Sequence, residues 1–362
     1  MGSSLAERLV KNSKNIFSYV ASEDKAKIRD WIDTGNIALN SQISADPFRG
    51  IASGIIYQLA GPESAGKTFI AIEIIKRAQE NGYTVIYYDT EGSLTTEEFI
   101  KRGLDENMIV HSIVNTVKSL QTDLLNQFDQ ITEKDKLIVV IDSIGMLSSL
   151  KEISDAKSGS EKADFTRPKE LRSFFRTITA PAKIKQIPII AINHTYDDPS
   201  SLYGGQKIAG GGGSKYSSSV VLSITKSQHK EGTTIVGSYA TCTAVKNRYG
   251  REKTKVKVEI NFNKGMSKWS GLFDVALECG FLISPTQGWY CTKDNKDSKF
   301  RRKEVEDNDD FWNGLLKNGL TEELKKYFSY QSHADSVFES EDVVEVLDIE
   351  DDVIDLEEIE KE

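Results

Sequence analysis

Residues 61–68 combine glycines, a lysine and a threonine at a spacing suited to holding a chain of phosphates. Glycine lets successive backbone N–H groups turn toward an anion, and a following helix adds partial positive charge at its N-terminus. In this arrangement we expect Lys67 to contact the β- and γ-phosphates and the Thr68 hydroxyl to bind Mg²⁺. The apolar run 55–59 before the segment and the amphipathic run 68–80 after it favour a nucleotide-binding loop over an ordinary glycine-rich turn. The residues of this phosphate loop are Gly61, Pro62, Glu63, Ser64, Ala65, Gly66, Lys67 and Thr68.

Two acidic side chains stand at the ends of apolar runs that read as strands. Asp142 follows the run 137–141, where a carboxylate is expected to hold Mg²⁺ through water. The alternative role for Asp142 is to cap the next turn, which Ser143 can also do. Glu91 follows the run 85–88 and is a candidate general base for water, with a helix cap as the alternative.

One histidine and two long polar segments stand at the ends of the same kind of run. His194 follows the run 187–192 and is a candidate sensor of the γ-phosphate, although a lone histidine is often only a satisfied polar residue. The polar, Gly/Ser-rich segments 151–167 and 195–215 do not fit regular structure. Unstructured connections of this length are usually functional or disordered. Ligands of open α/β sheets gather at the carboxyl ends of the strands, so both segments are candidate binding loops.

The pattern around these residues predicts an α/β protein with a mostly parallel central sheet flanked by helices. Between residues 36 and 272, short β-branched runs alternate with amphipathic ones, as expected for strands joined by crossover helices. The predicted strands are 55–59, 85–88, 137–141, 187–192, 220–225, 238–245 and 256–262. The predicted helices are 68–80, 120–131, 169–183 and 273–279.

We divide the chain into a helical N-terminal arm (1–35), a core (36–272), a small C-terminal lobe (273–338) and an acidic tail (339–362). The tail has thirteen acidic residues and one basic residue, so its charge is −12, against −9 for the whole chain. Such a segment is expected to be solvated and disordered. It could instead form a helix if a partner covered its apolar side chains. The remaining residues carry only +3, so any nucleic-acid site must be local. Residues 292–312 are polar. They have two possible interpretations, a disordered insert or a second DNA contact.

Composition excludes several classes of protein. The three cysteines are widely spaced, which argues against a disulfide scaffold or a zinc cluster. The apolar runs are far shorter than the roughly 18 residues that a membrane span requires. The N-terminal segment carries charge throughout and lacks the apolar stretch of a signal peptide. We therefore expect a soluble cytoplasmic protein with no membrane partner.

Six motifs in this order resemble the RecA group of homologous-recombination ATPases, in particular the UvsX-type recombinases of tailed phages. The resemblance covers residues 36–300, whereas the arm and the tail are similar by character only. The first and third motifs occur in several phosphate-loop ATPases, and the others are more selective. The motifs are GPESAGKT (61–68), YYDTEGSL (87–94), LIVVIDS (137–143), AINH (191–194), GGGGSKY (210–216) and VKNR (245–248).

The resemblance implies roles in catalysis for four residues and a role in nucleotide binding for a fifth. Glu91 is expected to activate water. His194 stands where bacterial relatives have a glutamine that senses the γ-phosphate, so its hydrogen-bond chemistry differs. Lys246 and Arg248 match two cations that reach the nucleotide of the neighbouring subunit, the alternative being two solvated bases at a strand end. Phe99 is a candidate for stacking on adenine, with core packing as its rival.

The resemblance also makes the two long loops DNA-binding loops. The first leads into a helix on which Lys169, Arg172 and Arg176 share one face, suited to the phosphates of a strand; the alternative is an ordinary solvated face. In the second loop, glycines between 210 and 213 let backbone N–H groups approach phosphates, and lysines add charge. The residues of this second site are Lys207, Gly211, Gly212 and Lys215.

The implied protein is a DNA-dependent ATPase that uses ATP and Mg²⁺ and forms helical filaments on single-stranded DNA. Within the filament, the bound strand is expected to exchange partners with double-stranded DNA, for recombination, repair and recombination-dependent replication. A single-stranded DNA-binding protein and a recombination mediator are expected partners in the cytoplasm of an infected bacterium. Two alternatives are a ring-forming helicase or other ATPase on the same fold, and a mediator that coats DNA without exchanging strands.

Overall fold

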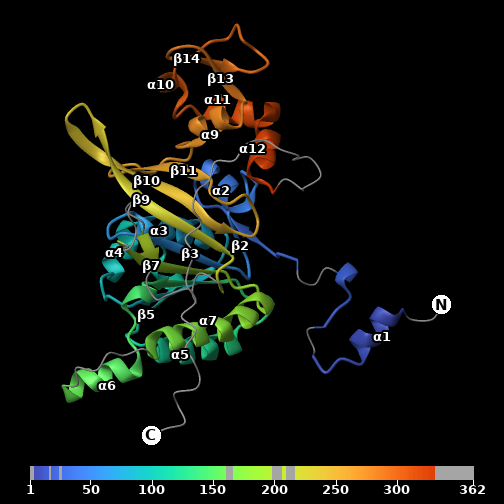
Figure 1. Cartoon of the computed structure of the whole chain (residues 1–362), viewed down its shortest axis with the longest axis vertical. Helices are drawn as coiled ribbons and strands as arrows, with labels where there is room; N and C mark the ends of the chain where they lie inside the picture. Colours follow the sequence, from blue (N-terminus) through green and yellow to red (C-terminus); the bar gives the residue numbers. More distant parts are fainter. Residues whose placement is uncertain are drawn as a thin grey trace, which may run out of the picture. The chain divides into compact units, whose positions relative to one another are not determined.

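The computed structural model describes residues 4–15, 18–23, 27–159, 166–197, 206–208 and 217–330. Its central feature is a sheet in which the strands lie in the order β12-β11-β10-β9-β3-β7-β6-β4-β5 (Figure 1). The pairs from β9 to β5 along this order are parallel, and those from β9 to β12 are antiparallel. The predicted mostly parallel α/β sheet is therefore confirmed.

The strands and helices have the following bounds. The strands are β1 (Trp31–Ile32), β2 (Ile51–Ala52), β3 (Ile56–Gly61), β4 (Thr84–Asp89), β5 (Ile109–Ile113), β6 (Leu137–Asp142), β7 (Ile189–Asp197), β8 (Gln206–Ile208), β9 (Val220–Glu231), β10 (Thr234–Asn247), β11 (Lys255–Asn261), β12 (Gly265–Met266), β13 (Leu282–Thr286) and β14 (Trp289–Thr292). The α-helices are α1 (Leu5–Lys11), α2 (Ile37–Ser44), α3 (Lys67–Glu80), α4 (Thr96–Lys101), α5 (Val117–Gln130), α6 (Leu150–Ser158), α7 (Thr166–Ile184), α9 (Leu272–Glu278), α10 (Arg302–Val305), α11 (Asp309–Leu315) and α12 (Thr321–Phe328). Short helical turns are η1 (Ala21–Glu23), η2 (Glu106–Met108), η3 (Ile144–Met146) and the π-helical η4 (Leu316–Leu320).

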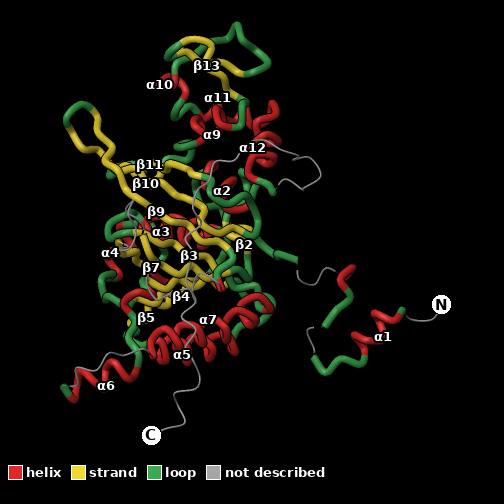
Figure 2. The backbone as a smooth tube through the Cα atoms, viewed as in Figure 1, coloured by secondary structure: helices red, strands yellow, loops and turns green. Residues whose placement is uncertain are grey.

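Side chains alternate between two apolar cores on the two faces of the sheet. In β6, Ile138 and Val140 belong to the core that contains α3, whereas Val139 and Ile141 belong to the core that contains α5 and α7. This alternation follows from the two-residue period of a strand. Both faces are covered by helices, as Figure 2 shows, which explains why the central strands read as continuous apolar runs.

The segment after β12 forms a small lobe built around aromatic side chains. Trp312 is fully buried, and its ring contacts those of Trp269 and Phe273. Leu324 and Phe328 of α12 belong to the same apolar core as residues of α2. Residues 292–312 are ordered here and contain α10 and part of α11, so the structure corrects the alternative of a disordered insert.

Two further expectations need correction. The predicted helical arm is helical in only part of its described residues, because Trp31 and Ile32 pair as a strand with β2. The first polar segment is not irregular throughout, since residues 150–158 form α6, which begins with a capping box between Ser149 and Glu152. The acidic tail lies outside the described residues. None of the described helices is long and apolar enough to span a membrane.

Candidate active site

The phosphate loop connects the central strand β3 to helix α3. Gly66 has a φ of 97°, a conformation that glycine adopts without strain, and α3 begins at the next residue. The Lys67 side chain is 5% exposed, and its Nζ donates to the carbonyls of Gly61 and Pro62 at 2.9 and 2.6 Å. Burial lowers the pKa of Lys67, and the nearby Asp142 carboxylate opposes this shift. The loop therefore holds one buried cation where a phosphate chain is expected.

Asp142 and Thr68 form an oxygen-rich pair beside this cation. The Thr68 hydroxyl donates to Asp142 Oδ2 at 2.7 Å, and so does the Tyr87 hydroxyl at 2.7 Å. Burial raises the pKa of Asp142, and these two hydrogen bonds offset part of the rise. A hydroxyl and a carboxylate are hard oxygen ligands, so the donor set fits Mg²⁺.

Glu91 and His194 face each other across the same edge of the sheet. Glu91 Oε1 lies 3.4 Å from His194 Nε2, and the two side chains are 40% and 24% exposed. Their position follows from strand register. His194 pairs with Gly61 at the start of the phosphate loop. Asp89 pairs with Asp142, and Glu91 follows Asp89 by two residues. The carboxylate and the imidazole therefore lie at the edge of the sheet that carries the predicted γ-phosphate position.

Buried Asp89 fixes the turn that carries Glu91. Asp89 Oδ1 accepts hydrogen bonds from the backbone N–H groups of Glu91 and Gly92 at 3.0 and 2.7 Å. Its Oδ2 accepts one from Leu94 and lies 3.3 Å from His111 Nε2. The side chain is 1% exposed, so this acid positions the loop and does not face the pocket.

The predicted nucleotide site is a cavity of about 290 Å³. It brings together residues from the phosphate loop, from the ends of β4 and β6, and from within β7. The lining residues are Glu63, Ser64, Ala65, Gly66, Lys67, Thr68, Phe69, Glu91, Ser93, Asp142 and His194. Sequence reasoning thus identified most of this pocket.

Phe99 does not line the cavity, and the structure corrects its assignment to adenine. Its side chain is 2% exposed in the apolar core. Its ring makes edge contacts with Tyr87 and His111, with ring centroids 5.4 Å away in each case. A ring enclosed in this way has no face for a base, so core packing explains this residue.

Lys246 and Arg248 lie away from the phosphate loop of their own chain. Lys246 pairs with Val221 of β9, and Val221 pairs with Gln58 of β3. Gln58 precedes Gly61, where the loop begins, by three residues, or about 10 Å along the strand. Because β10 runs antiparallel to β9, Arg248 lies still further from the loop end of the sheet. Neither cation lines the cavity described above.

The end of β10 that carries these two cations is anchored to the body of the protein. Asn247 Nδ2 donates to the backbone carbonyl of Gln42 at 2.8 Å, and the Tyr330 hydroxyl donates to the carbonyl of Asn247. Lys246 is half-buried and Arg248 is exposed. Arg248 is thus presented to the outside on a fixed backbone.

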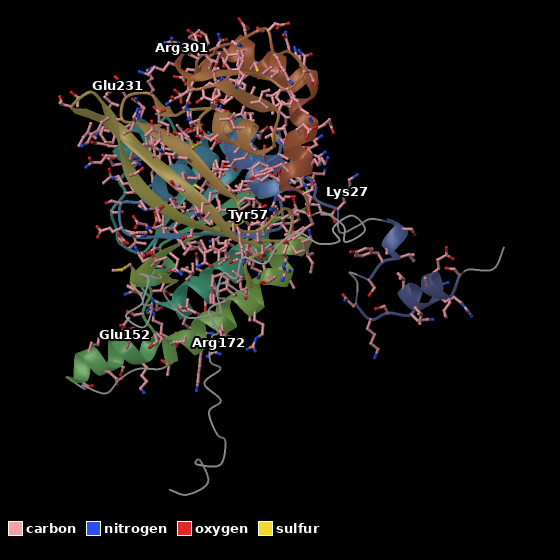
Figure 3. All side chains as sticks on the ribbon, turned by 45° about the horizontal axis from the view of Figure 1, so that its top comes forward. Lys27, Tyr57, Glu152, Arg172, Glu231 and Arg301 are labelled. Atoms are coloured by element: carbon pink, nitrogen blue, oxygen red, sulfur yellow. The ribbon has the colours of Figure 1, made fainter. Side chains whose placement is uncertain are left out.

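The predicted DNA-facing residues are only partly described. Lys169, Arg172 and Arg176 are exposed on α7, whose opposite side buries Phe174 and Ile178; Figure 3 labels Arg172 on this helix. Lys207 lies in β8, which pairs with β7. Gly211, Gly212 and Lys215 lie outside the described residues.

The sequence did not predict Phe69 and Ser93, which line the cavity, nor Asp89 and Tyr87, which support its lining from behind. Asp89 stands at a strand end, where it reads as a cap, and Tyr87 reads as an ordinary core residue. A signal existed for Asp89 and Tyr87, since β4 carries polar groups within a run that is otherwise apolar. Their partners become visible only when the register between β4 and β6 is known.

A phosphate loop on the central strand of a mostly parallel sheet, with acids at the ends of neighbouring strands, defines a P-loop ATPase with a RecA-type core. Comparison with protein families agrees. The model of the RecA N-terminal domain matches residues 10–267, and the model of the C-terminal domain of the bacteriophage T4 recombination and repair protein matches residues 269–320. The chain belongs to the RecA family of homologous-recombination ATPases and is of the phage UvsX type.

Individual relatives span most of the chain. The recombination and repair protein of Enterobacteria phage T4 is 35% identical over 295 residues, which are 80% of this chain and 74% of that protein. The RecA protein of Acinetobacter baumannii is 28% identical over 269 residues, 73% of this chain and 74% of that protein. The crystal structure of the RadB recombinase aligns over 65% of this chain and 98% of that one, with 20% identity and a TM-score of 0.48.

Proposed function

We propose that this protein is an ATP-dependent DNA strand-exchange recombinase whose catalytic sites are completed between neighbouring subunits. The observation that carries the proposal is the separation within one chain between the nucleotide cavity and the cations Lys246 and Arg248. Those cations can serve a nucleotide only if they belong to another copy. A head-to-tail contact of this kind, repeated without closing, generates an open helical filament.

Each group in the site has a distinct task under this proposal. Lys67 leaves the carbonyls of its loop and binds the β- and γ-phosphates, while Thr68 and Asp142 hold Mg²⁺. The metal, when bound, neutralises phosphate charge. Glu91 orients and deprotonates the attacking water, and the neighbour's arginine stabilises the charge that develops on the γ-phosphate.

The nucleotide is coupled to DNA through the strand ends that follow the site. His194 lies in β7, which leads into the second predicted DNA loop. Its ring also packs against the turn η3, because a Cβ added to Gly145 would lie 3.0 Å from His194 Cδ2. Arg167, at the start of α7, donates to the carbonyl of Gly145. When the γ-phosphate leaves, His194 loses its contact. The resulting movement is transmitted through β7 and through Arg167 to the two predicted DNA loops, and the filament loosens.

Contacts to DNA are mainly to phosphates, so they carry little sequence information, and base pairing selects the partner strand. The proposed partners are single- and double-stranded DNA, a single-stranded DNA-binding protein and a mediator. The acidic tail competes with DNA for basic loops. The site of action is the cytoplasm of an infected bacterium.

The direct test is ATP hydrolysis at increasing protein concentration, with and without single-stranded DNA. We expect turnover per subunit to rise with concentration and with DNA, and joint molecules to form between a single strand and a homologous duplex. Turnover without joint molecules would identify a coat protein instead. Closed rings with ATP in electron micrographs would favour a ring-forming ATPase.

Arginines on α7 give a prediction about DNA binding. The double substitution Arg172→Ala and Arg176→Ala should weaken binding to single strands of any sequence. The plot of log K against log salt concentration has a negative slope. If both side chains contact phosphates, this slope becomes shallower by about 1.4, at roughly 0.7 per contact. Fluorescence anisotropy across a salt series measures this slope.

The matched control for this prediction replaces Lys101 and Lys264 by alanine. Both are exposed, and neither is on α7, so the change in net charge is the same. An equal loss of slope in the two double variants would mean that α7 has no special part in binding DNA.

A further inference from the structure

Two consecutive buried tyrosines of β4 hold carboxylates on opposite faces of the sheet. The Tyr87 hydroxyl donates to Asp142 Oδ2 at 2.7 Å, and the Tyr88 hydroxyl donates to Asp123 Oδ2 at 2.6 Å. Both side chains are fully buried. The alternation of a strand sends Tyr87 toward the nucleotide site and Tyr88 toward the core beneath α5.

The ring of Tyr87 is held in place by other rings. Phe99 contacts its side at 5.4 Å and an interplanar angle of 69°, and His111 lies at 6.2 Å and 65°. Phe99 and His111 also contact each other. Because this cluster restricts the ring, the Tyr87 hydroxyl reaches a fixed point at the end of β6.

At that point the hydroxyl shares one carboxylate oxygen with the phosphate loop. Asp142 Oδ2 accepts both the Tyr87 and the Thr68 hydrogen bonds. Among the residues that the structure describes, no donor to Asp142 Oδ1 is found. One oxygen is thus occupied by protein donors, and the other would be available to a water molecule bound to Mg²⁺.

We propose that Tyr87 is a positioning residue for the metal site, whose hydroxyl fixes the orientation of the Asp142 carboxylate toward Mg²⁺. The inference rests on the proposed ATPase function and adds a residue to it. Partners that orient metal-binding carboxylates typically change metal affinity by about 10–100-fold when they are removed. Tyr87 itself does not line the cavity, so its effect passes through Asp142.

The test is the Mg²⁺ dependence of nucleotide binding by the full-length Tyr87→Phe variant. The substitution removes one oxygen and keeps the ring in its aromatic cluster. Binding of a fluorescent ATP analogue is followed while Mg²⁺ is titrated, and again in excess EDTA. We expect the half-saturating Mg²⁺ concentration to rise about 10-fold and the affinity in EDTA to stay unchanged. Steady-state turnover should regain most of its kcat at high Mg²⁺.

Tyr88→Phe is the matched control, because it removes a neighbouring buried hydroxyl that also donates to a carboxylate. We expect its Mg²⁺ dependence to equal that of the unmodified protein. An equal shift in both variants would mean that β4 is merely loosened, and no shift in Tyr87→Phe would mean that Thr68 alone orients Asp142. Either result overturns the inference while nucleotide binding itself persists. Failure of the unmodified protein to bind the nucleotide would instead overturn the proposed function.

Discussion

Replacing Lys67 by alanine should lower ATP turnover by about 10²–10³-fold and abolish nucleotide-dependent filaments. The substitution removes a buried cation from the cavity lining, whose Nζ donates to the carbonyls of Gly61 and Pro62. Without it, the charge on the β- and γ-phosphates is left to the metal and the backbone N–H groups. Loss of one such stabilising group lowers kcat by about 10²–10³-fold, and nucleotide binding should weaken as well.

The measurement combines steady-state ATPase rates with electron micrographs of the protein on single-stranded DNA. Lys76→Ala is the control, since it removes a half-buried lysine from the same helix α3, outside the cavity. That variant should keep both activities. If Lys67→Ala hydrolysed ATP at the unmodified rate, the cavity would not be the catalytic site.

Replacing Arg248 by alanine should remove the stimulation of ATP hydrolysis by DNA. An arginine supplied to the γ-phosphate by a neighbour is worth about 10³–10⁵ in kcat, and this side chain is exposed at the end of β10. Nucleotide affinity of dilute, unassembled protein should be unchanged, because Arg248 does not line the cavity of its own chain. Titration of a fluorescent nucleotide and ATPase assays on DNA measure the two effects.

Arg251→Ala is the matched control for Arg248→Ala. This exposed arginine lies three residues further along, with its guanidinium 5.7 Å from the ring centroid of Tyr327, so its loss makes the same change in charge at a neighbouring position. A loss of nucleotide affinity in dilute Arg248→Ala would place the arginine at its own site. Unchanged turnover on DNA would give it no part in catalysis.

The phosphate loop and the strand ends were predictable because their signals are local. Lys67 and Thr68 belong to one contiguous motif, and Asp142 directly ends an apolar run. The capping box at Ser149 and Glu152 was also a readable local signal, yet the composition of the segment suggested a loop. Local patterns therefore identify which residues do chemistry better than they identify every element.

Features that depend on pairing between distant segments were not predictable. Trp31 and Ile32 have helical spacing with Ile28, but they pair with β2, so tertiary contact overrides the local preference. The hydrogen bond from Tyr87 to Asp142 requires the register of β4 against β6. Phe99 follows the same rule, because only the packed core shows that its ring is enclosed.

The most direct test of a site shared between subunits mixes two inactive variants, Glu91→Gln and Arg248→Ala. Glu91→Gln lacks the catalytic base but keeps its arginine, and Arg248→Ala has the reverse defect. In a random equal mixture on single-stranded DNA, about one interface in four joins an intact Glu91 to an intact Arg248 of the neighbour. We predict that the mixture recovers about a quarter of the unmodified ATPase rate under this head-to-tail arrangement. A mixture as inactive as its two components would contradict a catalytic site completed between neighbouring subunits.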